Sequence, residues 1–380
     1  MKVLIIGGVA AGTKVAAKLK RENRGCDVTI LTKSKEISYA GCGLPYYVGK
    51  VIPDRNQLIV NTPESFSKLT GVQVLTGVEV TKVNPIEKTV DAIDLNTKET
   101  LKYKYDKLVI ASGADAIKPP VDGAKLKGVF FMRTPDDAIA LREAVESGEI
   151  KRVVVVGGGF IGLEVAENLS SQGVKVSVID MAKHVLPGFD EEFAEYVENH
   201  LADQGIMTFT ETKLEAILGE GKVEKIKTNK RALKADAVIL SVGIRANTAF
   251  LADTGIELMP NKTIKVNESL QTNIENIYAV GDCATVTNKL TKEPAWSPMG
   301  SSANIAGRIA AKNINGANIA YQGVLGTAVA KLPEFVKDEK LLLVCAKGKR
   351  AYMLQNRLKY FGYTNTLVLE GGTTLNKVAI

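Results

Sequence analysis

Continuous apolar runs that end in glycines are the dominant pattern along this 380-residue chain. Residues 2–8 read KVLIIGG and residues 152–159 read RVVVVGGG. Apolar runs rich in β-branched residues predict strands of a parallel sheet that is buried on both faces. Each run is followed by a segment that reads as a helix, and then by a second strand at 27–32 or 175–180. The pattern therefore predicts two strand–turn–helix–strand units.

The glycines between each first strand and its helix indicate what the two units do. A glycine turn allows backbone N–H groups and a helix N-terminus to meet a pyrophosphate. The second turn carries the full GxGxxG pattern in Gly157, Gly159 and Gly162, and Asp180 ends the next strand where a ribose-binding acid belongs. Glycines that only permit tight helix–sheet packing are the alternative. Two such turns in one chain favour two dinucleotide sites.

The first turn departs from this pattern at two positions. Gly7 and Gly12 hold the outer places, but Val9 takes the middle one. Thr32 stands where the ribose-binding acid is expected, and a hydroxyl bonds a ribose less strongly than a carboxylate does. Glu36 is a candidate substitute, although its spacing differs from the pattern.

Composition and charge narrow the class of protein. Apolar residues make up 45% of the chain and charged residues 24%, as in soluble globular proteins. The formal net charge is +7, but the basic residues are not interleaved with aromatic ones, and small phosphorylated ligands explain them as well. We therefore predict no nucleic-acid partner. No apolar run is long enough to span a bilayer, and glycines break the apolar start, so neither a membrane partner nor a signal peptide is predicted.

The four cysteines, Cys26, Cys42, Cys283 and Cys345, are widely and unevenly spaced. No pair has the spacing of a zinc site or of a disulfide framework, so a reducing cytoplasmic location is predicted and no metal site is expected. Cys42 is unusual because it lies between two glycines in the segment SYAGCGLPYY at 38–47. A cysteine in that setting raises the question of which sulfur it reacts with.

Three further segments resemble the flavin-dependent pyridine nucleotide-disulfide oxidoreductases. They are ASGA at 111–114, TNIENIYAVGDCA at 272–284 and GSSANIAGRIAAKNI at 300–314. The resemblance, which extends to about residue 328, implies an α/β fold of two three-layer dinucleotide-binding domains. A discontinuous FAD domain would comprise 1–112 and 244–322, with the NAD(P)H domain inserted at 113–243. A helix N-terminus beside the flavin would stabilise negative charge on it.

Within that family, SYAGCGLPYYVG resembles the branch with a single redox cysteine. This branch comprises coenzyme A-disulfide reductases, NADH oxidases and peroxidases, and persulfide reductases. Tyr47 occupies the place of the second cysteine, so Cys42 is expected to react with an external sulfur or oxygen species. The first glycine loop lacks the histidine of the oxidase and peroxidase branches, which favours the coenzyme A-disulfide and persulfide reductases. One departure is Gly41, where asparagine is usual.

The resemblance also implies binding residues. Those expected to contact FAD are Gly7, Gly8, Gly12, Lys33, Ala111, Gly113, Arg133, Gly281, Asp282, Ser301 and Ala303. Those expected to contact NADH or NADPH are Gly157, Gly159, Phe160, Ile161, Gly162, Glu164, Asp180 and Gly243. Those expected to contact coenzyme A are Lys14, Lys18, Arg21 and Ser38.

Two of these assignments leave alternatives open. Lys14, Lys18 and Arg21 are spaced four and three apart, so they share one helix face. That basic stripe suits the phosphates of coenzyme A, but a solvated lysine face has the same spacing. Asp180 favours NADH because an acid repels a 2′-phosphate, whereas Lys183 is compatible with NADPH.

The tail, residues 323–380, resembles the second half of a rhodanese domain. Cys345 in the loop CAKGKRA is either a candidate second redox centre or a structural remnant. The α+β interface domain that the family carries after residue 328 is not recognised here. We therefore expect a monomer, or a dimer that is not the family's.

The predicted activity is reduction of coenzyme A disulfide or coenzyme A persulfide by NADH or NADPH through FAD and Cys42, with small thiols as products or partners. An NADH oxidase that cycles Cys42 through a sulfenic acid is one alternative. A nucleotide-binding flavoprotein with little turnover is the other.

Overall fold

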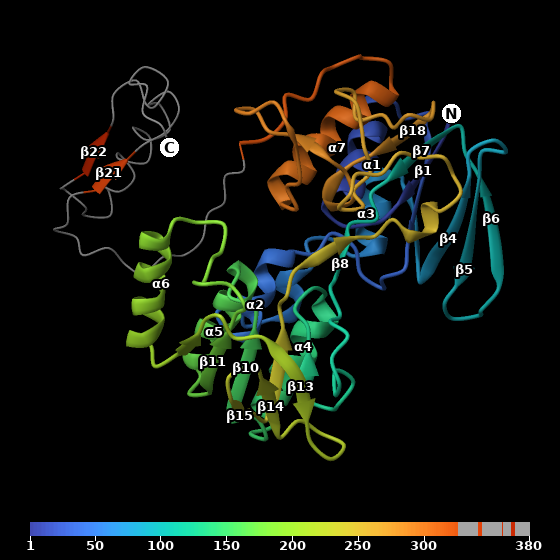
Figure 1. Ribbon diagram of the computed structural model, residues 1–380. Helices are drawn as coiled ribbons and strands as arrows, with labels where there is room; N and C mark the ends of the chain where they lie inside the picture. Colours follow the sequence, from blue (N-terminus) through green and yellow to red (C-terminus); the bar gives the residue numbers. More distant parts are fainter. Residues whose placement is uncertain (326–340, 344–358, 360–365, 369–380) are drawn as a thin grey trace. The chain divides into compact units, whose positions relative to one another are not determined.

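The computed structural model describes residues 1–325, 341–343, 359 and 366–368. Contacts divide the chain into a compact unit of residues Met1–Ala328 and a second unit of residues Val329–Ile380 (Figure 1). The first unit contains two parallel five-stranded sheets, each built around one of the glycine turns. In the second unit, β21 (Leu341–Leu343) pairs in parallel with β22 (Thr366–Val368). Cys345 lies outside the described residues, and the rhodanese-like character of the tail stays a prediction.

The first sheet has the strand order β18-β7-β1-β2-β3. Its strands are β18 (Ile277–Ala279), β7 (Lys107–Ile110), β1 (Lys2–Ile6), β2 (Asp27–Thr32) and β3 (Gln73–Thr76). Successive side chains of a strand point to opposite faces, so β1 supplies two separate cores. Val3 and Ile5 pack with the helices, whereas Leu4 and Ile6 pack with an antiparallel sheet. This arrangement explains why the β1 run is apolar at consecutive positions.

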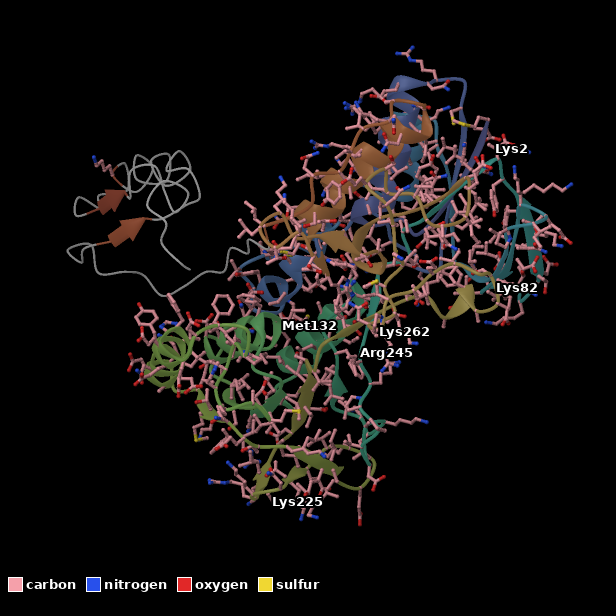
Figure 2. The ribbon with its side chains drawn as sticks, turned by 45° about the horizontal axis from the view of Figure 1, so that its top comes forward. Lys2, Lys82, Met132, Lys225, Arg245 and Lys262 are labelled. Carbon is pink, nitrogen blue, oxygen red and sulfur yellow. The ribbon has the colours of Figure 1, made fainter. Side chains whose placement is uncertain are left out.

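The layers on the two faces of the first sheet come from distant parts of the chain. The helical layer consists of α1 (Ala10–Glu22) and α7 (Gly300–Ile314), which pack against each other, together with α3 (Pro63–Thr70). The opposite layer is an antiparallel sheet of β4 (Val78–Asn84), β5 (Thr89–Asp94) and β6 (Thr100–Lys104). Figure 2 labels Lys2 of β1 and Lys82 of β4.

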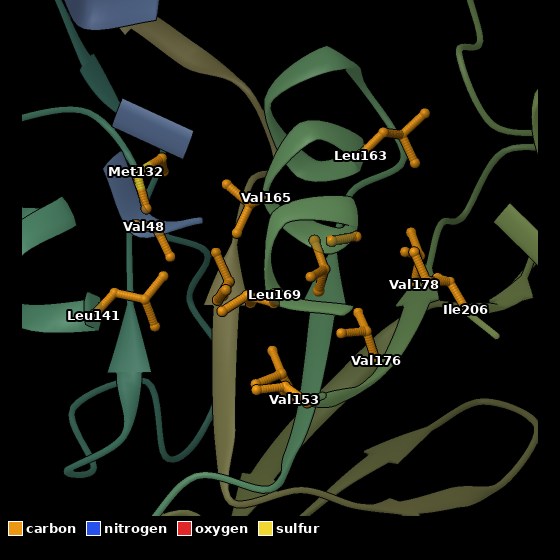
Figure 3. Packing of buried hydrophobic residues seen from close by; sticks show 14 of the residues in the cluster. Val48, Met132, Leu141, Val153, Leu163, Val165, Leu169, Val176, Val178 and Ile206 are labelled. Atoms are coloured by element: carbon orange, nitrogen blue, oxygen red, sulfur yellow. The ribbon is translucent and has the colours of Figure 1, made fainter. Parts of the chain in front are cut away.

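The second sheet repeats the same plan with the order β12-β11-β10-β16-β9. Its strands are β12 (Met207–Phe209), β11 (Lys175–Ile179), β10 (Arg152–Val156), β16 (Ala237–Leu240) and β9 (Val129–Phe130). Its helices are α4 (Pro135–Glu146), α5 (Phe160–Ser170) and α6 (Glu191–Asp203). Its antiparallel layer consists of β13 (Leu214–Leu218), β14 (Lys225–Thr228) and β15 (Ala232–Lys234). Figure 3 shows Val153 and Val176 of the sheet packed with Leu169 of α5.

Short elements connect the two sheets. The chain leaves the first sheet through β8 (Ala114–Ala116) and returns through β17 (Ile244–Ala246), and these strands pair antiparallel. Strand β18 then completes the first sheet beside β7, so this sheet is assembled from two separate stretches of sequence. The remaining pair is β19 (Val286–Thr287) with β20 (Pro294–Ala295). Single 3-10 turns are formed by Gly41–Gly43, Arg55–Leu58, Ala249–Leu251 and Gly281–Cys283.

The predicted α/β class with two dinucleotide-binding folds is confirmed by these sheets. The antiparallel layer on each sheet was not predicted, because its strands are short and mix polar with apolar residues. No helix among the described residues is both long and apolar enough to cross a membrane.

The second sheet should depend on Leu169, which is fully buried between α5 and the sheet. We expect Leu169→Ala to lower the free energy of unfolding by about 2–5 kcal/mol, because the truncation loses burial and leaves a cavity. Ile86→Ala is the control, since Ile86 is 95% exposed and its truncation should change stability by less than about 0.5 kcal/mol. Urea denaturation followed by circular dichroism measures both. Equal effects of the two substitutions would contradict the core assignment.

Candidate functional site

The first glycine turn joins β1 to α1 and is closed by backbone contacts. Gly7 has a φ of +107°, and a Cβ there would overlap the carbonyl oxygen of Ala111. A Cβ on Gly12 would overlap the carbonyl oxygen of Gly7. The helix begins without a side-chain cap and without an acidic residue in its first turn. Its N-terminal N–H groups therefore suit an anionic pyrophosphate.

The second turn shows which glycines serve packing and which serve a ligand. Gly157, with a φ of +110°, and Gly162 both lie against backbone that a Cβ would overlap. Gly159, by contrast, has no atom within 4 Å of the place where its Cβ would stand. That open space lies at the uncapped start of α5. The packing alternative thus explains Gly157 and Gly162, whereas the open space at Gly159 fits a bound nucleotide.

Asp180 follows β11 and reaches back to the second turn. Its carboxylate accepts hydrogen bonds from the backbone N–H of Gly158 at 2.6 Å and of Ala182 at 2.8 Å. The matching position in the first turn, Thr32, is buried and turns its methyl group toward Gly8. Glu36, the candidate substitute acid, is instead ion-paired with Arg55. Only the second turn therefore has a carboxylate in the ribose position.

Phe160, Ile161 and Gly243 also surround the second turn. The Phe160 and Ile161 side chains are partly exposed at the start of α5. The Phe160 ring meets the Phe189 ring edge-on, with 5.7 Å between their centroids. Gly243, with a φ of +101°, follows β16. Phe189 was not predicted, because an aromatic residue in a loop carries no sequence signal of its own.

Several residues predicted to contact FAD converge from different segments. A Cβ on Gly281 would stand 2.9 Å from the Cβ of Ala11 and 3.8 Å from that of Ala303, so the start of α1, the 3-10 turn and the start of α7 meet there. The carboxylate of Asp282 accepts a hydrogen bond at 2.8 Å from Arg133, whose Nε donates to the carbonyl oxygen of Ala114 at 2.7 Å.

The outer part of this cluster holds the remaining predicted contacts. Gly113 has a φ of +69° and lies near the Arg133 guanidinium, because a Cβ on it would stand 3.8 Å from Nη2. Lys33 forms an exposed ion pair with Asp115 at 3.1 Å. Ser301 lies in the first turn of α7, which has no side-chain cap. The uncapped start of α1 fits the pyrophosphate of a flavin dinucleotide, and the uncapped start of α7 fits its ring. The Asp282 carboxylate fits its hydroxyl groups.

Cys42 lies in the 3-10 turn Gly41–Gly43, directly before α2 (Leu44–Val48), and is exposed. Cys26 and Cys283 are buried, and burial raises the pKa of both thiols. Cys42 is therefore the accessible thiol among the cysteines that the structure describes. Reaction with a dissolved sulfur compound requires such access.

The segment after Cys42 is held by the helices of the second sheet, through a group of contacts that we call the Arg142 clamp. The Arg142 guanidinium lies 4.4 Å from the centre of the Tyr47 ring. Its Nη1 donates hydrogen bonds at 3.2 Å to three backbone carbonyls, those of Tyr47, Ile52 and Pro53. No local sequence pattern indicates this role, because Arg142 reads as a solvated residue of α4.

Tyr46 and Glu164 form a second contact between the same two parts of the chain. The Tyr46 hydroxyl donates a hydrogen bond to Glu164 Oε1 at 3.1 Å. Burial, followed by the nearby Glu164 carboxylate, raises the pKa of Tyr46 to about 12. Burial also raises the pKa of Glu164. Glu164 was predicted to contact NAD(P)H, and the structure places it beside the segment that carries Cys42.

The residues predicted to contact coenzyme A lie on α1 and next to it. Lys18 is ion-paired with Glu22 at 2.7 Å, which offsets part of the positive charge of the stripe. Lys14 lies beside α7, because a Cβ on Gly307 would stand 3.2 Å from the Lys14 Cβ. Ser38 has a φ of +51° and donates its backbone N–H to the Gly8 carbonyl at 2.9 Å. Contact of the basic stripe with coenzyme A therefore stays a prediction.

Comparison with known proteins identifies the family. The profile described as pyridine nucleotide-disulphide oxidoreductase matches residues 1–306. The chain belongs to that family. It is 37% identical over 361 residues to a protein named NADH oxidase from Methanocaldococcus jannaschii, covering 94% of this chain and 80% of the relative. It is also 37% identical to the NAD(P)H coenzyme A polysulfide/persulfide reductase of Pyrococcus horikoshii, covering 87% of this chain and 73% of the relative.

A relative whose structure has been solved has the same fold as this chain. The structure of reduced CoADR-RHD from Bacillus anthracis matches with a TM-score of 0.84 at 34% identity. The match covers 87% of this chain but 59% of that one, so this chain spans less than two thirds of the solved relative.

The two kinds of glycine in the second turn give a matched test. We expect Gly159→Ala to fold as the wild type but to bind NADH about tenfold more weakly, equivalent to about 1.4 kcal/mol, because the methyl group fills the open space. Gly157→Ala should fail to fold the second sheet, because its backbone has a positive φ and its Cβ overlaps the backbone. Calorimetric titration with NADH and circular dichroism measure these outcomes. Unchanged NADH affinity in Gly159→Ala would refute the site.

Proposed function

We propose that this chain is an FAD-dependent NAD(P)H oxidoreductase that reduces coenzyme A disulfide or coenzyme A persulfide through Cys42. The observation that carries the proposal is one exposed thiol, at the start of a helix that bridges two dinucleotide-binding folds. Tyr47, in place of a second cysteine, is buried under Arg142, so the segment offers no internal disulfide partner. The name of the Pyrococcus horikoshii relative supports the same substrate class.

In the proposed reaction, Cys42, the flavin site and the nicotinamide site each have one role. The Cys42 thiolate attacks the substrate disulfide, so that a Cys42–S–S–R bond forms and one thiolate RS⁻ leaves. When bound, the flavin supplies a two-electron relay between nicotinamide and sulfur. Those two electrons cleave the Cys42 disulfide and return the Cys42 thiolate together with a second RS⁻. Each turnover consumes one NAD(P)H and one proton and releases two thiols.

The nucleotides would be held by residues of the two turns. The open space at Gly159 and the Asp180 carboxylate would hold the NAD(P)H pyrophosphate and ribose. The start of α1, Asp282 and the start of α7 would hold FAD. Lys14 and Arg21 are the cations of the α1 stripe that form no ion pair within the described residues, and they would meet the phosphates of coenzyme A. The domain limits predicted from the sequence, 1–112 with 244–322 for FAD and 113–243 for NAD(P)H, stay part of this proposal.

An NADH oxidase is the second candidate, and the Methanocaldococcus jannaschii relative carries that name. In that reaction Cys42 would be oxidised to a sulfenic acid and reduced again. The two activities differ in their need for a disulfide or persulfide substrate. Consumption of NADH under oxygen without any disulfide would favour the oxidase, whereas anaerobic consumption that requires coenzyme A disulfide or persulfide favours the reductase.

Cys42→Ser tests the redox centre. We expect loss of coenzyme A disulfide reduction, because a hydroxyl cannot form the mixed disulfide, while NADH still bleaches the flavin absorbance. Stopped-flow spectroscopy at the flavin band separates the two half-reactions. Cys26→Ser is the control. Because Cys26 is buried, it cannot meet a dissolved disulfide, and its replacement should leave turnover unchanged. Wild-type turnover in Cys42→Ser would refute the role.

Asp180 should set the choice of nicotinamide. We expect kcat/KM to be roughly tenfold higher for NADH than for NADPH, about 1.4 kcal/mol, because the carboxylate repels a 2′-phosphate. Asp180→Ala should bring the ratio of kcat/KM for NADH to that for NADPH closer to one, mainly because NADH binds more weakly without the carboxylate. Asp203→Ala, an exposed acid at the end of α6, should leave the ratio unchanged. Equal kcat/KM values for both nucleotides in the wild type would count against the assignment.

A further inference from the structure

Helix α2 rests on three polar side chains of α5 and of the turn that follows it. They are spaced four residues apart and are those of Glu164, Asn168 and Gln172. Glu164 accepts the hydrogen bond of the Tyr46 hydroxyl at 3.1 Å, and the Gln172 Nε2 donates to the Val48 carbonyl at 2.8 Å. Residues four apart lie on one face of a helix, so these side chains form a continuous ridge. We call this ridge the α2 seat.

The tightest contact of the α2 seat is between Asn168 and Gly49, the residue after α2. A Cβ on Gly49 would stand 1.9 Å from Oδ1, 2.6 Å from Cγ and 2.7 Å from Cβ of Asn168. The φ of Gly49 is −75°, which any residue adopts, so this glycine is required by the close approach and not by its backbone angle. The Asn168 side chain is 9% exposed, and its Nδ2 donates to the Glu164 carbonyl at 2.7 Å, which holds it in place.

The connection from this contact to Cys42 is short and hydrogen-bonded. The backbone N–H of Gly49 donates to the Pro45 carbonyl at 3.0 Å. At the other end of α2, the backbone N–H of Leu44 donates to the Gly41 carbonyl, across Cys42. The Leu44 side chain is buried in the core of the second sheet. A displacement of α2 at Gly49 is therefore passed along the helix to the Cys42 turn.

Helix α5 also belongs to the proposed nucleotide site. It begins at Phe160, directly after Gly159, where the second glycine turn has its open space. One helix thus contacts the segment that carries Cys42 along its side and forms the nucleotide turn at its start.

We propose that Asn168 and Gly49 are positioning residues, whose contact fixes where α2 and the Cys42 turn lie. The inference rests on the proposed function, because the position of the Cys42 sulfur matters for the transfer of electrons to a bound disulfide. Neither residue exchanges atoms or protons in the reaction. Their role is to hold the Cys42 turn in the arrangement in which the sulfur step is fast.

The first test is Gly49→Ala, whose methyl group does not fit against Asn168. We expect coenzyme A disulfide to reoxidise the reduced enzyme about 10- to 100-fold more slowly, because a displacement of about 1 Å has effects of this order. NADH should reduce the enzyme at the wild-type rate, because Gly159 and Asp180 lie outside the contact. Stopped-flow spectroscopy measures the two half-reactions separately. Gly25→Ala is the matched control, because Gly25 is exposed and the nearest atom to its Cβ position is 3.6 Å away.

The second test is whether a smaller residue at Asn168 restores the sulfur step in Gly49→Ala. Asn168→Ala removes Oδ1 and Cγ but leaves the Cβ at 2.7 Å, so it should restore part of the rate. Asn168→Gly removes all three atoms and should restore more. Each double variant is compared with its single Asn168 variant, which separates the contact from the cost of a change inside α5. A contact that served stability alone would change both half-reactions together.

The third test needs no turnover. Hydrogen exchange followed by mass spectrometry reports local opening of the peptide 44–53. Exchange there should be faster in Gly49→Ala than in the wild type and should return toward the wild-type rate when Asn168→Gly is added. The peptide 27–32, which forms β2, is the internal control and should exchange equally in all variants.

The outcomes distinguish this inference from the proposed function. Wild-type rates and wild-type exchange in Gly49→Ala overturn the positioning role, as does a slowed sulfur step that neither Asn168 substitution improves. If the wild type reduces no sulfur substrate, the proposed function fails, and unchanged exchange of 44–53 then overturns the contact by itself. Should Gly49→Ala not fold, Gln172→Ala removes the hydrogen bond to Val48, and an unchanged sulfur step in that variant overturns the proposal.

Discussion

The burial of α2 in the core of the second sheet is the constraint on which the rest of the site depends. By sequence, α2 belongs to the first fold, since it follows β2 and precedes α3. Its side chains Leu44 and Val48 are nevertheless buried among residues of α4, α5 and β10. Burying each of these side chains contributes about 1.5–3 kcal/mol. The Cys42 turn is therefore positioned by the second fold as well as by its own.

The Arg142 clamp makes this attachment specific. The end of α2 and the turn after it carry backbone carbonyl oxygens, and such groups are costly to bury without a donor. Arg142 satisfies three of them with one guanidinium while its flat face covers the Tyr47 ring. Gln172 adds a hydrogen bond at 2.8 Å to the Val48 carbonyl. The aromatic ring of Tyr47, five residues after Cys42, is thus held from the opposite fold.

The parts of this molecule that could be predicted are those determined by short-range sequence. The β1 and β10 runs are apolar at consecutive positions because both faces of each sheet are covered, and a glycine turn follows each strand. The Lys18–Glu22 pair also has a local signal, a spacing of four on one helix. Arg142 meets carbonyls that lie 89 to 95 residues away in sequence, and Tyr46 meets Glu164 at a separation of 118 residues. No local pattern encodes those contacts. The pairing of Glu36 with Arg55 also has no local signal, because Arg55 belongs to a different segment.

These contacts restrict how the two folds can move. The covalent connection between them is the antiparallel pair β8–β17, which is short enough to allow rotation. Rotation would, however, draw Leu44 and Val48 out of the second core and break the bonds of the Arg142 clamp. The cost of exposing both side chains alone is about 3–6 kcal/mol, which keeps an opened arrangement well below one per cent of the molecules. The burial of α2 and the Arg142 clamp therefore favour an arrangement in which the Cys42 turn stays beside the second fold. On the exposed side of the Cys42 turn, Gly41 has no atom within 4 Å of its Cβ position, so the approach to this side of the turn is open.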